Sequence, residues 1–325
     1  MNILVTGGAG YIGSHTCKLL FELGHKPIVL DNLSNGRSEF VKWGPFIEGD
    51  IIDSGLVLTI VHKYKIESVI HFAANAYVGE SILNPRKYYN NNVISSISFI
   101  NTIVDAGIKF IVFSSSCSVY GIPQYNPIDE KHPCNPINPY GESKLIIENL
   151  LKWYGKVYNF NSISLRYFNA AGADPESVIG ECHDPETHLI PLAIQSTLKD
   201  QPYLKIFGAD YKTKDGTAIR DYIHVKDIAK AHIAAIIELK NGLETSVVNL
   251  GRGEGSSVFE VIETIENISG LKINYQIKSR REGDPSVLIS SNDYSKTLLN
   301  WLPDYKNLES IIKTSWDWHK KRGIS

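Results

Sequence analysis

Cysteine is scarce in this 325-residue sequence, which contains four cysteines and a single methionine. The cysteines (Cys17, Cys117, Cys134 and Cys182) are scattered along the chain, and no two of them form a CxxC pair. This pattern argues against a disulfide framework and against a zinc site, and it is typical of proteins in a reducing cytoplasm. We therefore expect no structural disulfide and no metal.

The sequence also lacks an excess of charge of either sign, and it lacks long apolar runs. The 33 lysines and arginines nearly balance the 35 aspartates and glutamates, which gives a formal net charge of −2. Such a balance does not suggest a nucleic-acid-binding protein. No apolar run approaches the roughly 18 residues of a membrane span, and the strand-like run at residues 3–5 leaves no room for the charged start of a signal peptide. We expect a cytoplasmic protein without nucleic-acid or membrane partners.

What the sequence does contain, in its first half, is an alternation of short β-branched runs and helical stretches. This alternation predicts an α/β fold in which a doubly wound parallel sheet of the Rossmann type is wrapped by helices. The predicted strands are residues 3–5, 27–30, 46–48, 68–72, 110–113 and 162–165, with 247–250 returning late to the same sheet.

The length predicts about two domains. We expect a cofactor-binding domain over residues 1–168, with a returning segment around 220–250, and a mainly substrate-binding smaller α/β domain over 169–325. An amphipathic helix is predicted at 308–321, with Trp316 packed in the core.

A glycine-rich turn directly follows the first predicted strand and opens a helix. Gly7, Gly10 and Gly13 have the spacing of a dinucleotide-binding turn, in which the backbone approaches a pyrophosphate at a helix N-terminus. Asp31 ends the second strand, 31 − 13 = 18 residues past the last glycine, close to the roughly 20 expected of a carboxylate that binds ribose hydroxyls. Because this carboxylate would repel a 2′-phosphate, the sequence predicts NAD rather than NADP.

A tyrosine and a lysine stand four residues apart in the segment from Tyr140 to Lys144, so on a helix they share one face. Pro139, just before them, suits a helix start. A tyrosine that acts as a base near pH 7 needs its pKa lowered by about 3 units, or about 4 kcal/mol. A neighbouring ammonium and the positive charge of NAD⁺ are the natural sources of that shift.

These motifs belong to a longer ordered series that spans the chain. The series comprises GGAGYIGSH, LDNLSNG, EGDI, IHFAA, VGES, YYNNNV, FSSSCSVYG, NPYGESK, LRYFNAAGA, DGTAIRDYIHV, NLG and RREGD. In this series the sequence resembles the extended short-chain dehydrogenase/reductase superfamily and, within it, the UDP-galactose (UDP-glucose) 4-epimerases. The resemblance implies reversible epimerisation at C4 of a UDP-hexose through a transient 4-keto sugar, with tightly bound NAD, in galactose metabolism and in a homodimer formed through helices near residues 93–106 and 143–154.

The resemblance also implies roles for individual residues. Tyr140 would be the base and acid, Lys144 would tune it and bind the nicotinamide ribose, and Ser116 would bind the sugar hydroxyl. The residues that match the family's NAD-contacting positions are Gly7, Gly10, Tyr11, Ile12, Gly13, Asp31, Asn32, Leu33, Ser34, Asn35, Gly36, Asp50, Ile51, Phe72, Ala73, Ala74, Asn91 and Phe168. Those that match its nucleotide-sugar positions, besides Ser116 and Tyr140, are Asn169, Leu189, Phe207, Arg220, Arg281, Asp284 and Leu288.

Two positions depart from the family pattern, and two others narrow the chemistry. Ala76 replaces a frequent lysine, and Leu288 stands where many bacterial members have tyrosine, which leaves the size of the accepted C2 substituent open. Related nucleotide-sugar 4,6-dehydratases need an acidic pair where this chain has Cys117 and Ser118, so 4,6-dehydration of the sugar is disfavoured. The alternatives that stay open are a 4-epimerase of UDP-N-acetylhexosamine or of UDP-xylose/UDP-arabinose and, in a different class, a non-catalytic NAD-sensing relative.

Overall fold

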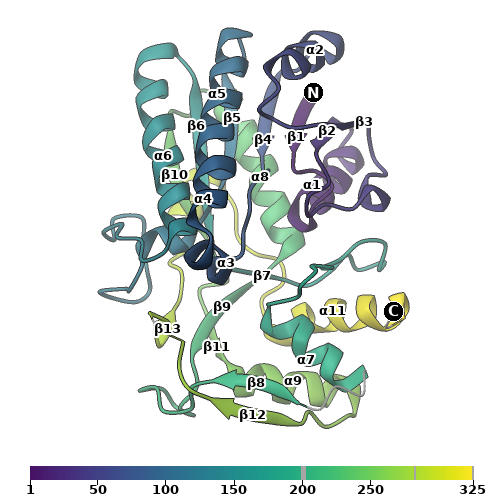
Figure 1. The fold of residues 1–325 in the computed structure, drawn as a ribbon, viewed down its shortest axis with the longest axis vertical. Helices are drawn as coiled ribbons and strands as arrows, with labels where there is room; N and C mark the ends of the chain where they lie inside the picture. Colours follow the sequence, from purple (N-terminus) through teal and green to yellow (C-terminus); the bar gives the residue numbers. More distant parts are fainter. Residues whose placement is uncertain (199–202, 282, 324–325) are drawn as a thin grey trace.

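The computed structural model describes residues 1–198, 203–281 and 283–323, and its centre is a seven-stranded parallel sheet (Figure 1). The strand order is β10-β6-β5-β4-β1-β2-β3. The strands are β1 (Asn2–Thr6), β2 (Lys26–Asp31), β3 (Phe46–Glu48), β4 (Ser68–His71), β5 (Phe110–Ser116), β6 (Asn161–Tyr167) and β10 (Ser246–Leu250). The predicted sheet is confirmed, including the late return of β10, which pairs in parallel with β6.

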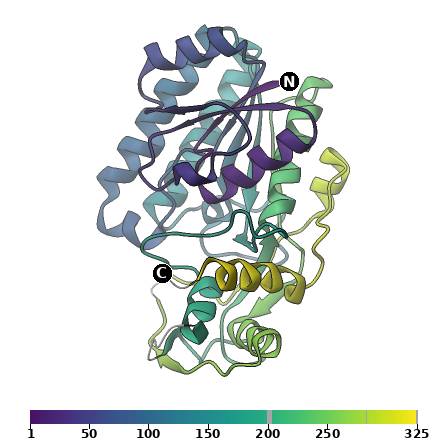
Figure 2. The ribbon, with the colours of Figure 1, turned by 90° about the vertical axis from the view of Figure 1, so that its right-hand side faces the viewer.

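Helices cover both faces of this sheet (Figure 2). They are α1 (Tyr11–Glu22), α2 (Ser54–Tyr64), α5 (Ser96–Asp105), α6 (Pro139–Tyr158) and α8 (Val225–Lys240). Ile3 and Val5 of β1 pack with α1 and α8 on one face, whereas Leu4 packs with α2, α5 and α6 on the other. Because successive side chains of a strand point to opposite faces, a sheet covered on both sides needs the uninterrupted apolar runs from which these strands were predicted.

A second group of elements lies beyond the carboxyl ends of the parallel strands (Figure 1). It contains a sheet of β11-β9-β13 with β7 added to β9, and a separate pair of β8 and β12. Its strands are β7 (Asn169–Ala171), β8 (Leu204–Phe207), β9 (Ile219–His224), β11 (Gly255–Ser257), β12 (Tyr275–Lys278) and β13 (Val287–Leu288). Its helices are α7 (Leu189–Leu198), α9 (Val258–Ser269) and α11 (Leu308–Arg322), while α10 (Asp293–Leu299) lies against α8 and β10.

The predicted tail helix is confirmed as α11, and Trp316 lies in the core that α11 shares with α7 and α9. Between β4 and α5 the chain forms α3 (Val78–Leu83), α4 (Pro85–Tyr88) and a π-helical stretch, Tyr89–Ser95. Within the described ranges, we find no helix with the length and apolarity required to cross a bilayer.

Candidate active site

A cavity of about 320 Å³ lies at the carboxyl ends of the central parallel strands. All of the cofactor residues expected from the resemblance line it, except Leu33. Leu33 instead forms the turn after β2, with a φ of 57°, and its amide donates to Asp31 Oδ1 at 2.9 Å. The cavity is therefore formed by segments from across the first half of the chain, together with residues 167–170 and the loop at residues 181–188.

The glycine-rich turn places the N-terminus of α1 at this cavity. Gly7 has a φ of +70°, and a Cβ there would lie 2.7 Å from the backbone nitrogen of Ala73. A Cβ on Gly13 would collide with the carbonyl oxygen of Gly7. The N-cap residue of α1, Gly10, has no side chain to cap the helix, and the first turn contains no acidic residue. The free N–H groups and the positive end of the helix dipole thus fit a pyrophosphate.

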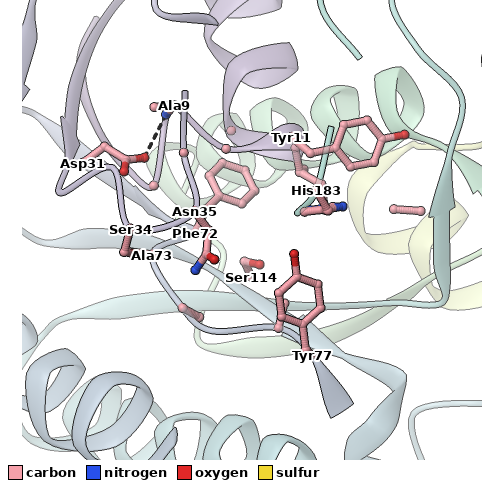
Figure 3. Close-up of a pocket in the computed structure, with 18 of the residues that line it drawn as sticks. Ala9, Tyr11, Asp31, Ser34, Asn35, Phe72, Ala73, Tyr77, Ser114 and His183 are labelled. Carbon is pink, nitrogen blue, oxygen red and sulfur yellow. Dashed lines mark hydrogen bonds between the residues drawn. The ribbon is translucent and has the colours of Figure 1, made fainter. Parts of the chain in front are cut away.

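Asp31 lies beside the glycine-rich turn, next to Ala9, at the wall of the cavity (Figure 3). Its carboxylate accepts hydrogen bonds from the amides of Ala9 and Leu33, each at 2.9 Å. Burial raises the pKa of Asp31, and these two amides act in the opposite direction. A carboxylate oxygen has more than one acceptor position, so Asp31 can still receive ribose hydroxyls while it holds the turn. These residues fit NAD.

Ser116, Tyr140 and Lys144 come together where β5 ends and α6 begins. Ser116 and Tyr140 line the cavity, and Asn138 caps α6 by accepting a hydrogen bond from the Gly141 amide at 2.8 Å. Lys144 lies behind them and does not line the cavity. Its Nζ donates to the carbonyl oxygen of Ser114 at 2.7 Å and lies 5.7 Å from the centre of the Tyr140 ring. The predicted shared helix face is present.

The pKa shifts of Tyr140 and Lys144 differ from the expectation that a charged lysine lowers the pKa of the tyrosine. Burial raises the pKa of Tyr140 well above its usual range, although Ser116 acts to lower it. Burial also lowers the pKa of Lys144 to about 7, with Glu148 opposing the shift. Because burial lowers the pKa of Lys144 toward neutral, a further positive charge at the cavity would help to lower the pKa of Tyr140.

A second cavity, of about 570 Å³, adjoins the first, and Asn169 lines both. The other expected nucleotide-sugar residues that line it are Leu189, Phe207, Arg220, Arg281 and Asp284. Arg220 pairs with Asp284 at 2.5 Å, and the guanidinium of Arg281 lies 4.1 Å from the centre of the Phe207 ring. Leu288 lines neither cavity: it is half-buried in β13, beside Arg220 of β9, and packs on a cluster that includes Phe168.

Sequence reasoning missed four residues at the junction of the two cavities, namely Glu181, His183, Glu186 and His188. In Figure 3, His183 lies between Tyr11 and Tyr77. Against the effect of burial, the histidines lower the pKa of Glu181 and the carboxylates raise that of His188. The E-x-H-x-x-E-x-H spacing of residues 181–188 was the sequence signal for this cluster. The spacing of the cysteines carries no information about it.

The parallel sheet, the glycine turn with Asp31, and the tyrosine-lysine pair beside an arginine-lined cavity define an NAD-dependent enzyme of the extended Rossmann class. A sequence model of the NAD dependent epimerase/dehydratase family matches residues 3–251. The chain belongs to this family.

Similar proteins cover nearly the whole chain. The UDP-glucose 4-epimerase of Rhizobium meliloti is 48% identical over 321 residues, which are 99% of this chain and 98% of that protein. The crystal structure of UDP-glucose 4-epimerase from Brucella ovis in complex with NAD superimposes with a TM-score of 0.95, at 46% identity over 97% of each chain. The UDP-Glc/GlcNAc 4-epimerase of Campylobacter jejuni has a TM-score of 0.86, at 42% identity over 98% of this chain and 99% of that chain.

Proposed function

We propose that this chain interconverts UDP-glucose and UDP-galactose by reversible epimerisation at C4, with NAD as a bound cofactor. The observation that carries this proposal is that Tyr140 and Ser116 line the cofactor cavity together with Asn169. Asn169 also lines the adjoining cavity that contains the arginines. A sugar whose UDP group occupies the second cavity can thus reach both side chains.

NAD would be held by the N-terminus of α1 and by Asp31, and when bound it supplies a hydride acceptor and donor for C4. Tyr140 takes the proton from the C4 hydroxyl, and it later returns that proton to the C4 oxygen when hydride is delivered to C4 from the opposite face of the sugar. Ser116 accepts or donates a hydrogen bond at the same oxygen. Lys144, held by the Ser114 carbonyl, positions Tyr140 and adds positive charge in its protonated form.

The second cavity supplies the grip on the UDP group. Arg220 comes from β9, and Arg281 comes from the loop after β12. Their guanidinium groups suit the two phosphates of a pyrophosphate. Asp284 forms an ion pair with Arg220, so the aspartate orients the arginine at the wall of the cavity. Firm binding of UDP leaves the hexose free to turn over between the two hydride transfers. We assign residues 169–325 mainly to this role and 1–168, with 220–250, mainly to NAD.

We also propose that the chain forms a homodimer through α5 and α6 and acts in the cytoplasm. Along α6, Trp153 and Val157 are 64% and 65% exposed and lie four residues apart on one helix face, and the adjacent Tyr158 is 58% exposed. An apolar stripe of this kind on a helix fits burial against a second copy. All four cysteines are free thiols, which fits a reducing compartment.

The test is product analysis after the untagged protein is mixed separately with UDP-galactose, UDP-N-acetylgalactosamine and UDP-arabinose. We expect conversion of UDP-galactose to UDP-glucose to be fastest. Absence of any C4 epimer, together with no reduced-nicotinamide absorbance after UDP and sugar are added, would instead indicate the NAD-sensing alternative.

A second candidate activity, on the N-acetylated pair, is favoured by Leu288. Leucine is smaller than the tyrosine found at this position in many hexose-restricted members, and the 42%-identical Campylobacter protein is named for both UDP-Glc and GlcNAc. We therefore expect weaker turnover of the N-acetylated pair, with a preference of about 10–200-fold for the hexose pair. A wild-type preference for the N-acetylated sugar would reverse this assignment.

A further inference from the structure

Four side chains in one eight-residue loop converge at the junction of the two cavities. One donor atom from each of Glu181, His183, Glu186 and His188 lies within 4.8 Å of the others. Glu181 Oε1 is 3.1 Å from His183 Nδ1 and 2.7 Å from His188 Nδ1. Glu186 Oε1 is 3.1 Å from His188 Nδ1, and Glu186 Oε2 is 3.9 Å from His183 Nδ1. Both histidines thus direct the same ring nitrogen toward both carboxylates.

A second, independent observation concerns the oxygen Glu186 Oε2. The Glu186 side chain is only 6% exposed, and Oε2 is buried without a hydrogen-bond partner among the described residues. Its other oxygen is already occupied, because Oε1 accepts the amides of Thr187 and His188 at 2.8 and 2.9 Å. A buried carboxylate oxygen without a partner is costly, so an oxygen aimed into a cluster of donor atoms indicates a missing ligand there.

The charges of the cluster point in the same direction. The side chains of Glu181 and Glu186 are 4% and 6% exposed, so two carboxylates share one nearly buried place. Buried charges of like sign require compensation by a partner or a metal, and the pairings with His183 and His188 leave Glu186 Oε2 without a hydrogen-bond partner in the described part of the chain. A divalent cation held by two carboxylates and two neutral imidazoles makes the group neutral.

We propose that Glu181, His183, Glu186 and His188 form a binding site for a divalent transition-metal ion, best matched by Zn²⁺. Zinc accepts imidazole nitrogen and carboxylate oxygen at about 2.0–2.2 Å in a tetrahedron. Donor atoms of such a tetrahedron are about 3.3–3.6 Å apart, and the carboxylate–imidazole distances here run from 2.7 to 3.9 Å, with all four donor atoms within 4.8 Å of one another. Only small side-chain shifts are needed to bring all four into contact with one ion.

The site is structural rather than catalytic, because four protein ligands leave no open position for water or substrate. The loop is already tied to the rest of the molecule at two backbone oxygens. Arg37 Nε donates to the Cys182 oxygen at 3.2 Å, and Trp318 Nε1 donates to the Glu181 oxygen at 3.0 Å. A metal in this loop would fix its remaining end, immediately before Leu189 at the start of α7, and so hold the wall between the two cavities. The site neither requires nor replaces the proposed epimerase activity.

The test uses the untagged full-length chain with its NAD. The protein is freed of metal with a chelator, equilibrated with buffered Zn²⁺, and its zinc content is measured by elemental analysis. We expect one ion per chain in the wild type. His183→Ala and His188→Ala should abolish this binding, and the conservative Glu186→Gln should weaken it more than about 10-fold. His62→Ala, which removes an exposed histidine in α2, is the matched control and should keep the ion.

Two further measurements keep the proposal falsifiable if a variant folds poorly. Co²⁺ in place of Zn²⁺ should give wild-type protein the visible absorption of a tetrahedral nitrogen-oxygen site, and Zn²⁺ should raise the melting temperature of the wild type but not of Glu186→Gln. Wild-type protein that binds no Zn²⁺ would show that the cluster is a hydrogen-bonded ion pair only, and would overturn the proposal. Zinc bound equally well by the wild type and by His183→Ala would overturn it too.

Discussion

The replacement Tyr140→Phe tests whether the phenolic oxygen of Tyr140 is the acid–base group of the reaction. It removes the phenolic oxygen and keeps the ring, which is 93% buried at the start of α6 and packs edge-on against Tyr88 at 6.5 Å between centroids. Loss of a positioned acid–base group lowers turnover by about 10²–10⁴-fold. That range corresponds to a barrier raised by about 3–5 kcal/mol. NAD should stay bound, because the expected cofactor contacts come from other residues.

The matched control is Tyr167→Phe. Tyr167 lines the same cavity, and its hydroxyl forms a 2.5 Å hydrogen bond with Ser114 Oγ. Tyr167 is half-buried and burial raises its pKa to about 12, so both tyrosines are neutral phenols that line the same cavity. The difference is that Lys144 and Ser116 lie beside Tyr140. We therefore expect Tyr167→Phe to retain most of the wild-type turnover.

The assay is kcat for conversion of UDP-galactose, measured together with the NAD content of each purified variant. Reduction of bound NAD by UDP and free sugar provides a second readout that does not require a complete cycle. A Tyr140→Phe enzyme with near-normal kcat would refute the assignment of the base. Equal losses in both variants would refute the distinction between the two tyrosines, and would indicate that both act by shaping the cavity.

Three further predictions concern cofactor choice, sugar choice and pH. Asp31→Asn should weaken NAD binding by about 10–100-fold, since a hydrogen bond to a charged group contributes about 1.5–3 kcal/mol. It should also relax discrimination against NADP. Dissociation constants for both cofactors measure this, and unchanged selectivity would contradict the prediction. Leu288→Tyr should reduce kcat/KM for the N-acetylated pair more than for the hexose pair, whereas equal losses would mean that position 288 does not influence the sugar pocket. Burial lowers the pKa of His71 to about 3, so the unfolded chain binds the proton between about pH 3 and 6.5 and stability is lost as pH falls below 6.5. Between pH 7 and pH 5 the loss from this residue is about 2 kcal/mol, and urea unfolding of His71→Gln should show that much less pH dependence than the wild type.

The fold could be predicted from the sequence where one local pattern determines it. The central strands are apolar on both faces, so β1, β4 and β5 are visible as uninterrupted runs. Parallel strands joined by helices then place their carboxyl ends at one edge, which is why the glycine turn and Ser116 could be expected to meet there. The late strand β10 was also predicted, because Val247–Leu250 has the same composition as the other buried strands.

The second cavity could not be predicted from local patterns. Asn169, Phe207, Arg220 and Arg281 come from segments separated by up to 112 residues (281 − 169). Asn169 and Arg220 are brought together by the pairing of β7 with β9, whereas Phe207 and Arg281 belong to the separate pair of β8 and β12 and the loop that follows it. Single arginines in irregular segments carry no spacing signal. Their grouping came from the resemblance to a family, and Leu288, which matches a position in the same set, lies outside the lining of both cavities and packs on the cluster that includes Phe168.

The burial of Tyr140 has a consequence for how a single residue serves as both base and acid. In this cavity the polypeptide favours the neutral phenol, and Lys144, with its pKa lowered to about 7, is only a partial source of positive charge. The phenolate is thus stable only when a further positive charge lies nearby. Oxidised nicotinamide carries such a charge and reduced nicotinamide does not. In the proposed mechanism, the proton affinity of Tyr140 would therefore rise when the sugar is oxidised and fall when it is reduced again. The phenol would then hold the proton during the 4-keto stage and give it up when a base is needed.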